Sequence, residues 1–235
     1  LRNGFVMPFR LSGRNVIDAA LAPPWLLALA RRGMPRFANM EAYAGSGDTA
    51  SFVGANVGGG FTWEAIARLR EKWRGPLLVK GILHPADAEK AREIGLDGVI
   101  VSNHGGRQFD AAPASVDMLP AIARAVGRDM TVLLDSGVVS GVDMVRALAC
   151  GARSTFSGRA FMLALAALGD DGARHMAATF IEEFRTALGQ SGIKSAGEIR
   201  SASIRHPTAW RFDGRMPEGD REETGCRMPP PSSTS

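Results

Sequence analysis

Cysteine is scarce in this chain, and its scarcity excludes two common kinds of structural site. Of the 235 residues only two are cysteines, Cys150 in an apolar segment and Cys226 in a polar one. Two cysteines so far apart provide neither a disulfide framework nor a paired-cysteine zinc site, and this usage fits a reducing compartment. The hydrophobic share of 45% and a mean hydropathy near zero indicate a globular protein with an ample core.

Long apolar runs and blocks of a single charge are also missing. The longest apolar stretch, around Phe161–Leu168, is much too short to span a bilayer. Leu1–Gly4 has neither an initiating Met nor the apolar region of a signal peptide, so a cytoplasmic location is expected. The net charge is only +4 and the arginines are scattered, so we expect no binding to nucleic acid.

Short apolar strands alternate with amphipathic helices between residues 62 and 170, at an interval of roughly 25–30 residues. The predicted strands are residues 77–80, 98–101, 131–134 and 153–157, and the predicted helices are residues 61–73, 85–94, 115–126, 142–150, 160 onward and 173–189. Thr62 is a predicted N-cap. Such alternation is typical of a parallel sheet covered by helices, an α/β fold.

The two flanks of this region have a different composition. Residues 1–60 are rich in Pro, Gly, Met and Arg, and they contain one predicted helical piece near residues 14–32 and a glycine-rich segment at residues 54–60. We therefore divide the chain into a loop and helix segment, residues 1–60, an α/β domain, residues 61–200, and a tail, residues 201–235. The tail ends in a low-complexity run of Pro, Ser and Thr and is expected to be disordered.

Each predicted strand is followed by polar residues that can carry chemistry. These residues are Lys80 after the first strand, Ser102 to Arg107 after the second, Asp135-Ser136-Gly137 after the third, and Gly158-Arg159 after the fourth. In α/β barrels the reactive groups lie at the carboxyl ends of the parallel strands, so all four sets should meet on one face.

Three of these side chains have a chemical interpretation beside a structural one. His104 suits a general base, because histidine changes its charge near neutral pH, and the alternative is a histidine that only caps the turn. Arg107 suits bidentate capture of a carboxylate, and the alternative is a surface salt bridge. Lys80 would be costly to bury alone and should have an anionic partner, unless it is a structural lysine that reaches to solvent.

Two glycine turns suggest where a phosphate would bind. Gly137 and Gly158 each lead into a predicted helix whose first amides can hold a phosphate, and Arg159 adds a cation. Either turn alone is weak evidence, since glycine is common there in any barrel. The other histidines, His84, His175 and His206, are interpreted as surface or capping residues.

Four motifs together resemble one enzyme family. They are Leu78-Val79-Lys80-Gly81-Ile82, Ser102-Asn103-His104-Gly105-Gly106-Arg107-Gln108, Asp135-Ser136-Gly137 and Gly158-Arg159-Ala160-Phe161. This set, with its spacing, resembles the FMN-dependent α-hydroxy acid dehydrogenases and oxidases, which include L-lactate dehydrogenase, mandelate dehydrogenase and glycolate oxidase. The resemblance covers nearly all of residues 1–200 and is greatest to the lactate and mandelate dehydrogenase branch.

The resemblance implies a (β/α)8 TIM barrel with FMN at its carboxyl face, of which residues 61–200 form the C-terminal half, strands 5–8. It implies that a small L-2-hydroxy acid is oxidised to the 2-oxo acid, with His104 taking a proton and Arg107 binding the carboxylate. Lys80 would face the flavin N1/O2 edge, where a cation stabilises the reduced form, and Ser102 would contact the flavin. The ribityl phosphate would be held by Asp135, Ser136, Gly137, Val138, Val139, Gly158 and Arg159. The electron acceptor is left open, and a homo-oligomer is expected.

Two departures from the family pattern affect these expectations. Val139 stands where the pattern has an arginine that helps to bind FMN, which should cost roughly 1.5–3 kcal/mol of phosphate binding. The similarity also starts in the middle of the pattern, so we expect an N-terminally truncated chain without the first four strands. Its sheet edges would be unpaired, and alone it should be inactive and should aggregate or self-associate.

Three further interpretations follow from the same residues. One is a non-catalytic half-barrel that binds FMN or phosphate. Another is a phosphate barrel of the inosinate dehydrogenase type, which needs a nucleophilic cysteine in a loop, and neither cysteine is suitably placed for that role. The third concerns Pro23–Arg32, whose apolar and basic mix would suit peripheral contact with the inner membrane surface. The alternative for that segment is a helix packed on the barrel or on a partner subunit.

Overall fold

The computed structural model describes residues 12–33, 38–40 and 61–199. The glycine-rich segment at residues 54–60 and the predicted tail at residues 201–235 lie outside these ranges. The chain divides into two compact units, Leu1–Ile66 and Ala67–Ser235, and each is described by itself.

The first unit contains a pair of short helices. These are α1 (Gly13–Ala20) and α2 (Pro23–Arg32), followed by the 3-10 turn η1 (Ala38–Met40). The prediction of one helical piece near residues 14–32 is wrong at Leu21, which caps α1. The break arises because Pro23 lacks an N–H and restricts the residue before it, so it starts a new helix. Ser12 caps α1 by accepting a hydrogen bond from the Asn15 N–H, at 3.2 Å.

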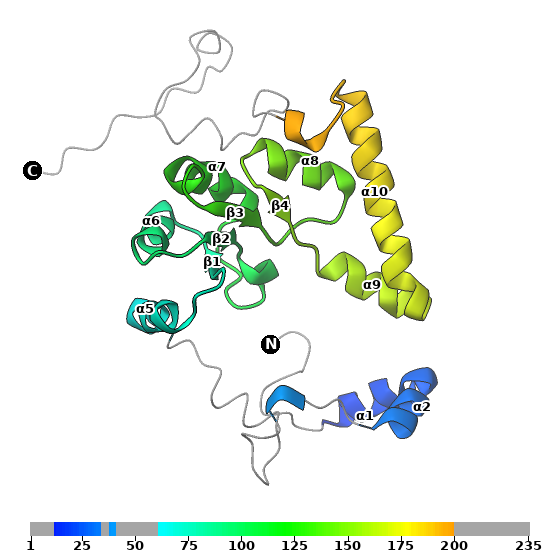
Figure 1. Cartoon of the computed structure of the whole chain (residues 1–235). Helices are drawn as coiled ribbons and strands as arrows, with labels where there is room; N and C mark the ends of the chain where they lie inside the picture. Colours follow the sequence, from blue (N-terminus) through cyan, green and yellow to red (C-terminus); the bar gives the residue numbers. More distant parts are fainter. Residues whose placement is uncertain (1–11, 34–37, 41–60, 200–235) are drawn as a thin grey trace, which may run out of the picture. The chain divides into compact units, whose positions relative to one another are not determined.

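The second unit is an α/β layer built on four parallel strands in the order β1-β2-β3-β4 (Figure 1). The strands are β1 (Leu78–Ile82), β2 (Gly98–Val101), β3 (Thr131–Leu134) and β4 (Ser154–Thr155). The helices are α5 (Trp63–Lys72), which starts before the division between the units, α6 (Pro85–Glu93), α7 (Ser115–Val126), α8 (Gly141–Ala149), α9 (Arg159–Leu168) and α10 (Gly172–Gln190). Three 3-10 turns, η2 (His104–Gly106), η3 (Gly169–Asp171) and η4 (Ala196–Glu198), complete the described elements.

The predicted alternation of strands and helices is confirmed, as is the N-cap at Thr62. The Thr62 hydroxyl accepts a hydrogen bond from the Ala65 N–H, at 3.3 Å, and the His84 ring caps α6 by accepting one from Ala86. Since each crossover connects neighbouring parallel strands, the carboxyl ends of all four strands lie at one edge of the layer.

The core lies between the sheet and the helices that connect its strands. α6 packs on β1 and β2, α7 packs on β2 and β3, and α8 packs on β4. The largest fully buried apolar side chains of this core are Val99, Val101, Leu119, Ile122, Val126 and Leu134. A second cluster joins α8 to α10 and contains Val145, Ala149, Ala187, Leu188 and Ile199.

Two strands differ from their predictions. β1 runs on to Ile82, and it is not the buried strand that was expected, because Leu78 is 36% exposed and Lys80 is also exposed. β1 pairs only with β2 among the described strands, so one of its sides is uncovered. The fourth strand was expected at residues 153–157 but forms only two ladder residues, Ser154 and Thr155, on the opposite edge.

Candidate active site

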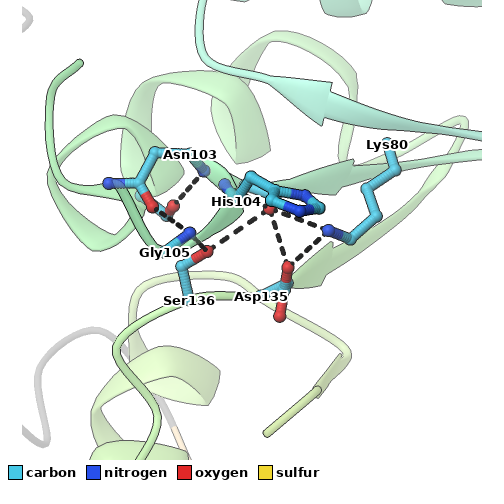
Figure 2. A network of polar contacts seen from close by, with 8 residues as sticks. Lys80, Asn103, His104, Gly105, Asp135 and Ser136 are labelled. Carbon is cyan, nitrogen blue, oxygen red and sulfur yellow. Dashed lines mark hydrogen bonds and ion pairs between the residues drawn. The ribbon is translucent and has the colours of Figure 1, made fainter. Parts of the chain in front are cut away.

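Three strand ends supply the side chains of one polar network. Figure 2 shows Lys80 from β1 directed toward Asp135 from the turn after β3, with Ser136 next to Asp135 and with Asn103 and His104 from the turn after β2 beside them. The predicted convergence of polar strand ends is thus present in the structure. This convergence follows from the strand register, in which Lys80 pairs with Ile100 and Ile100 pairs with Leu133. Ser102 and Asp135 each come two residues after these paired positions, so they lie next to each other.

The Ser102 hydroxyl is the centre of this network. It is 1% exposed, accepts hydrogen bonds from Lys80 Nζ (3.1 Å) and the His104 N–H (3.1 Å), and donates one to Asp135 Oδ2 (2.7 Å). The Ser136 hydroxyl lies 3.3 Å from the Ser102 hydroxyl oxygen. A buried hydroxyl with this many partners fixes the three strand ends relative to one another, and its loss would leave buried polar groups unpaired.

Lys80 has the anionic partner that its position demands. Its Nζ lies 2.6 Å from Asp135 Oδ2, and the carboxylate side chain is 19% exposed while the lysine side chain is 43% exposed. Burial acts to raise the pKa of Asp135, but hydrogen bonds from Lys80 and Ser102 and the lysine charge outweigh it. The pKa of Asp135 therefore lies below its ordinary value. The pair fixes one cation at the edge of the site.

The turn after β2 has an unusual backbone. His104, Gly105 and Gly106 have φ values of 55°, 68° and 72°, which lie in the left-handed region. His104 and Ser136 (φ 80°) are the non-glycine residues with positive φ within the described parts of the chain. Such conformations cost energy for residues with a Cβ and cluster at functional sites. The two turns are connected, since the Gly105 N–H donates a hydrogen bond to the Ser136 hydroxyl over 2.9 Å.

Asn103 and Ser115 hold this turn in place. The Asn103 side-chain oxygen accepts a hydrogen bond from the Gly105 N–H (3.0 Å), and its amide donates to the Pro113 carbonyl (3.2 Å). The Asn103 N–H in turn donates to the Ser115 hydroxyl (2.9 Å), which is buried at the start of α7. Sequence reasoning assigned no role to either residue. The signal for Asn103 was present, since asparagine commonly hydrogen-bonds the backbone two residues on.

A cleft opens beside the network and collects the other predicted site residues. It is lined by Lys80, His104, Gly105, Arg107, Asp135, Ser136, Gly137, Val138, Val139, Phe156, Ser157, Gly158, Arg159 and Met162. Every predicted site residue except the buried Ser102 therefore lines this cleft. Phe156, Ser157 and Met162 were not predicted, and Ser157 stabilises the wall by donating a hydrogen bond to the Val138 carbonyl over 2.7 Å.

Three side chains in the cleft have no polar partner in the described part of the chain. Among the described residues, none forms a hydrogen bond or ion pair with the side chain of His104, Arg107 or Arg159. The Arg159 guanidinium lies against Gly105, where an added Cβ would be 3.1 Å from Nη2. Two free guanidinium groups and an imidazole in one cleft suit an anionic ligand with an acidic or hydroxylic proton.

Cys150 lies outside this cleft. It is buried at the end of α8, and burial raises the pKa of its thiol, which opposes the thiolate form that a nucleophile needs. Cys226 falls outside the described residues. In the described ranges, no group of three or more His, Cys, Asp or Glu side chains is arranged to hold a metal ion.

Comparison with known proteins identifies the family. The sequence profile of the FMN-dependent dehydrogenase family matches residues 1–206. The chain belongs to this family. Its members are FMN-dependent oxidoreductases, and the expected flavoenzyme relationship is thereby confirmed.

The relatives of this chain include L-lactate dehydrogenases. L-lactate dehydrogenase from Pectobacterium atrosepticum is 40% identical over 208 residues, which is 86% of this chain and 54% of that protein. L-lactate dehydrogenase from Caulobacter vibrioides is 42% identical over 198 residues, covering 82% of this chain and 52% of that protein. The chain therefore spans about half the length of the curated relatives it matches.

Solved structures of mandelate enzymes match this family member as well. A monotopic membrane protein, (S)-mandelate dehydrogenase, superposes with a TM-score of 0.80 and 35% identity, over 87% of this chain and 55% of that one. A mandelate oxidase superposes with a TM-score of 0.57 and 43% identity, over 59% of this chain and 42% of that one. The α/β fold with a parallel sheet is consistent with part of the TIM barrel of these flavoenzymes.

Proposed function

We propose that this chain carries the reactive half of a site that oxidises a small L-2-hydroxy acid to the 2-oxo acid with FMN. The observation that carries the proposal is the cleft in which His104, Arg107 and Arg159, whose side chains have no polar partner among the described residues, meet the fixed cation of Lys80. These groups fit an acidic substrate and a flavin phosphate. The named relatives act on lactate or mandelate, which are acids of this class.

Each side chain has one task in the proposed reaction. Arg107 binds the substrate carboxylate with its two-pronged guanidinium and so orients the neighbouring carbon. His104 accepts a proton from the substrate hydroxyl, and its left-handed backbone directs the imidazole to the cleft. FMN, when bound, supplies the two-electron acceptor. Lys80, held by Asp135 and Ser102, places a positive charge where negative charge develops on the flavin.

The remaining cleft residues are proposed to position the flavin. Ser102 is buried beneath the turn and would act there by fixing Lys80 and the His104 N–H. Val138, Gly137 and Ser136 line the wall after β3, and Gly158 opens α9 without a side-chain cap. The backbone N–H groups at the start of α9 and the Arg159 guanidinium would then face the phosphate.

The test is a visible absorption spectrum of the purified, desalted chain after incubation with FMN. A retained flavin band that bleaches anaerobically with L-lactate or L-mandelate would support the proposal and would overturn the expectation that the chain alone is inactive. A chain that retains FMN but is not bleached would support the second candidate, a non-catalytic flavin-binding half-barrel, which the Val139 departure favours. A colourless protein would contradict both.

We also propose that the α1–α2 pair contacts a membrane surface. In the described parts of this pair no side chain is buried, and several large apolar ones are well exposed. They are Val16, Ile17, Leu21, Trp25, Leu26 and Leu27. Arg31 and Arg32 end α2 and add positive charge next to this apolar surface. One structural relative is itself a monotopic membrane protein. None of the helices in the described ranges is long and apolar enough to cross a bilayer.

Flotation with anionic vesicles tests the membrane proposal. The chain is expected to float with the vesicles, and a Trp25→Ser/Leu26→Ser variant is expected to float less. An Ile181→Ser variant is the control, since Ile181 is also apolar and exposed but lies on α10, outside the helix pair. If the unaltered chain does not float, the membrane proposal is wrong, and a protein partner would cover the helix pair instead.

Self-association is proposed from the uncovered parts of the second unit. Among described strands, β1 and β4 each have one unpaired side, and α9 exposes Met162, Leu163, Leu165 and Leu168. Unpaired strand edges and apolar helix faces are surfaces through which chains associate. Light scattering after gel filtration should give a mass above 24.9 kDa. A monomer at all concentrations would contradict the proposal.

A further inference from the structure

The start of α8 is closed to an anion by the chain's own carboxylates. The Val139 N–H donates to Asp143 Oδ2 (3.1 Å), and the Ser140 hydroxyl donates to the same oxygen (2.8 Å). The Ser140 hydroxyl also accepts a hydrogen bond from the Asp143 N–H, at 3.2 Å. One residue on, the Gly141 N–H donates to Glu183 Oε2 at 2.7 Å. Donors that a phosphate would need at this end are therefore occupied, and two negative charges lie beside them.

The side chains on this wall of the cleft are apolar. Val139 is 58% exposed and lines the cleft together with Phe156 and Met162, which are 47% and 65% exposed. Valine offers neither charge nor hydrogen-bond donor. This wall can contact the sugar chain or ring of a flavin, but it gains nothing from a phosphate group.

Helix α9 provides one cation for a phosphate, Arg159. Arg159 opens α9 and lies against Gly105 without a polar partner among the described residues. Lys80 is engaged with Asp135. Arg107, three residues after His104, is proposed to bind the substrate carboxylate. A phosphate would therefore be held from the α9 side alone, by Arg159 and the first amides of that helix, and not from the α8 side.

We propose that this site discriminates only weakly between FMN and riboflavin, and that Val139 is the residue that sets this low specificity. The inference deepens the proposed function and rests on it, because it concerns the same flavin site. Most of the binding free energy would come from the ring and the ribityl chain, with little from the phosphate. An arginine at position 139, which the family pattern contains, would restore the missing charge from the α8 side.

The test is a pair of fluorescence titrations of the full chain, with FMN and with riboflavin. Their dissociation constants are expected to lie within about tenfold of each other. Val139→Arg is expected to tighten FMN binding by about tenfold or more and to leave riboflavin binding unchanged. Val142→Arg is the matched control, since Val142 is exposed three residues later, in the first turn of α8, but does not line the cleft. It should leave the ratio of the two constants unchanged.

The salt dependence of binding gives a second readout. With little phosphate contact, the affinities for FMN and riboflavin should fall by similar factors between low and high salt. Thermal melting checks that each variant is folded, and Val139→Lys replaces Val139→Arg if the arginine variant is not.

The outcomes separate the inference from the proposed function. A preference of the unaltered chain for FMN by more than about tenfold would overturn the inference and leave the proposed function standing. A folded Val139→Arg or Val139→Lys chain with an unchanged ratio would overturn it as well. If neither flavin binds, the inference and the proposed function are both wrong.

Discussion

The guanidinium of Arg159 lies against Gly105, so that a Cβ at position 105 would be only 3.1 Å from Nη2. Gly105 joins two requirements at one residue, because its φ of 68° also lies in the left-handed region. The residue thus connects the turn that carries the histidine to the helix that would face the flavin phosphate.

Gly105→Ala should therefore harm both stability and flavin binding. The left-handed backbone should cost about 1 kcal/mol of unfolding free energy, and Arg159 must move to avoid the new Cβ. Urea denaturation and FMN titration measure the two effects. Gly189→Ala in α10 is the control, since its Cβ would meet nothing within 4 Å, and it should not reduce stability. FMN affinity should fall by less than about tenfold, because the phosphate contributes little, and a larger fall would contradict that inference.

Asp135→Asn should change the pH dependence of stability. Because the pKa of Asp135 is lowered by folding, its ionised form stabilises the native state above the ordinary value of 3.8. This stabilisation is lost as the pH falls through the lowered pKa. At pH 7 the variant should be less stable by about 1–2 kcal/mol, a range reduced for the partial exposure of Lys80.

Denaturation curves at neutral and acidic pH measure this difference, which should shrink below about pH 4. Asp129→Asn is the control, since Asp129 forms an exposed ion pair with Arg92. That change should cost less than about 1 kcal/mol at any pH. A difference for Asp135→Asn that is constant with pH would show that the ion pair with Lys80 is not its source.

His104→Asn and Arg107→Lys should separate proton transfer from substrate binding in the FMN-loaded protein. If His104 is the base, its removal should lower kcat by about 10²–10⁴-fold with little change in flavin binding. Arg107→Lys should mainly raise KM, because lysine loses the bidentate contact with a carboxylate. Steady-state rates with L-lactate measure both effects. Arg92→Lys, on the outer surface, should behave as the unaltered chain, and a KM effect there would indicate a nonspecific charge effect.

Gly141→Ala should loosen the packing of α8 on α10. A Cβ at position 141 would lie 2.2 Å from the Phe184 N and 2.6 Å from the Glu183 carbonyl carbon. Both are backbone atoms of α10, which cannot shift as readily as a flexible side chain. Overpacking of this kind should cost about 3 kcal/mol. Chemical denaturation measures the loss. If Gly141→Ala is as stable as Gly189→Ala, the two helices are farther apart in solution than in the structure.

Much of the cleft could be predicted from sequence because its residues follow apolar strands directly. The runs before Ser102 and Asp135 are short and apolar, and parallel strands bring their ends together whatever else the chain does. The need of Lys80 for an anion could also be predicted, but not its identity. Asp135 is far from it in the sequence, and only the register of β1, β2 and β3 brings the two together.

Features that depend on tertiary neighbours were missed. The exposure of β1 could not be deduced from its apolar composition, since burial depends on what covers each side of a strand. The Asn103–Ser115 hydrogen bond joins a turn to the start of a helix that follows twelve residues later, and no local pattern indicates such a bond. The break between α1 and α2 had a clear local cause at Pro23, and the helical pattern on both sides obscured it.

The order of the strands in the sheet also has a kinetic consequence. Each strand pairs with the strand that follows it along the chain, so the contacts that build the sheet join segments close in sequence. Loop closure is then cheap, and the layer can form by successive docking of one strand and helix after another. β2 and β3 are paired on both sides, whereas the outer strands can fray. Hydrogen exchange should therefore be slowest in β2 and β3, which places the most persistent part of the fold directly beneath Ser102 and Asp135.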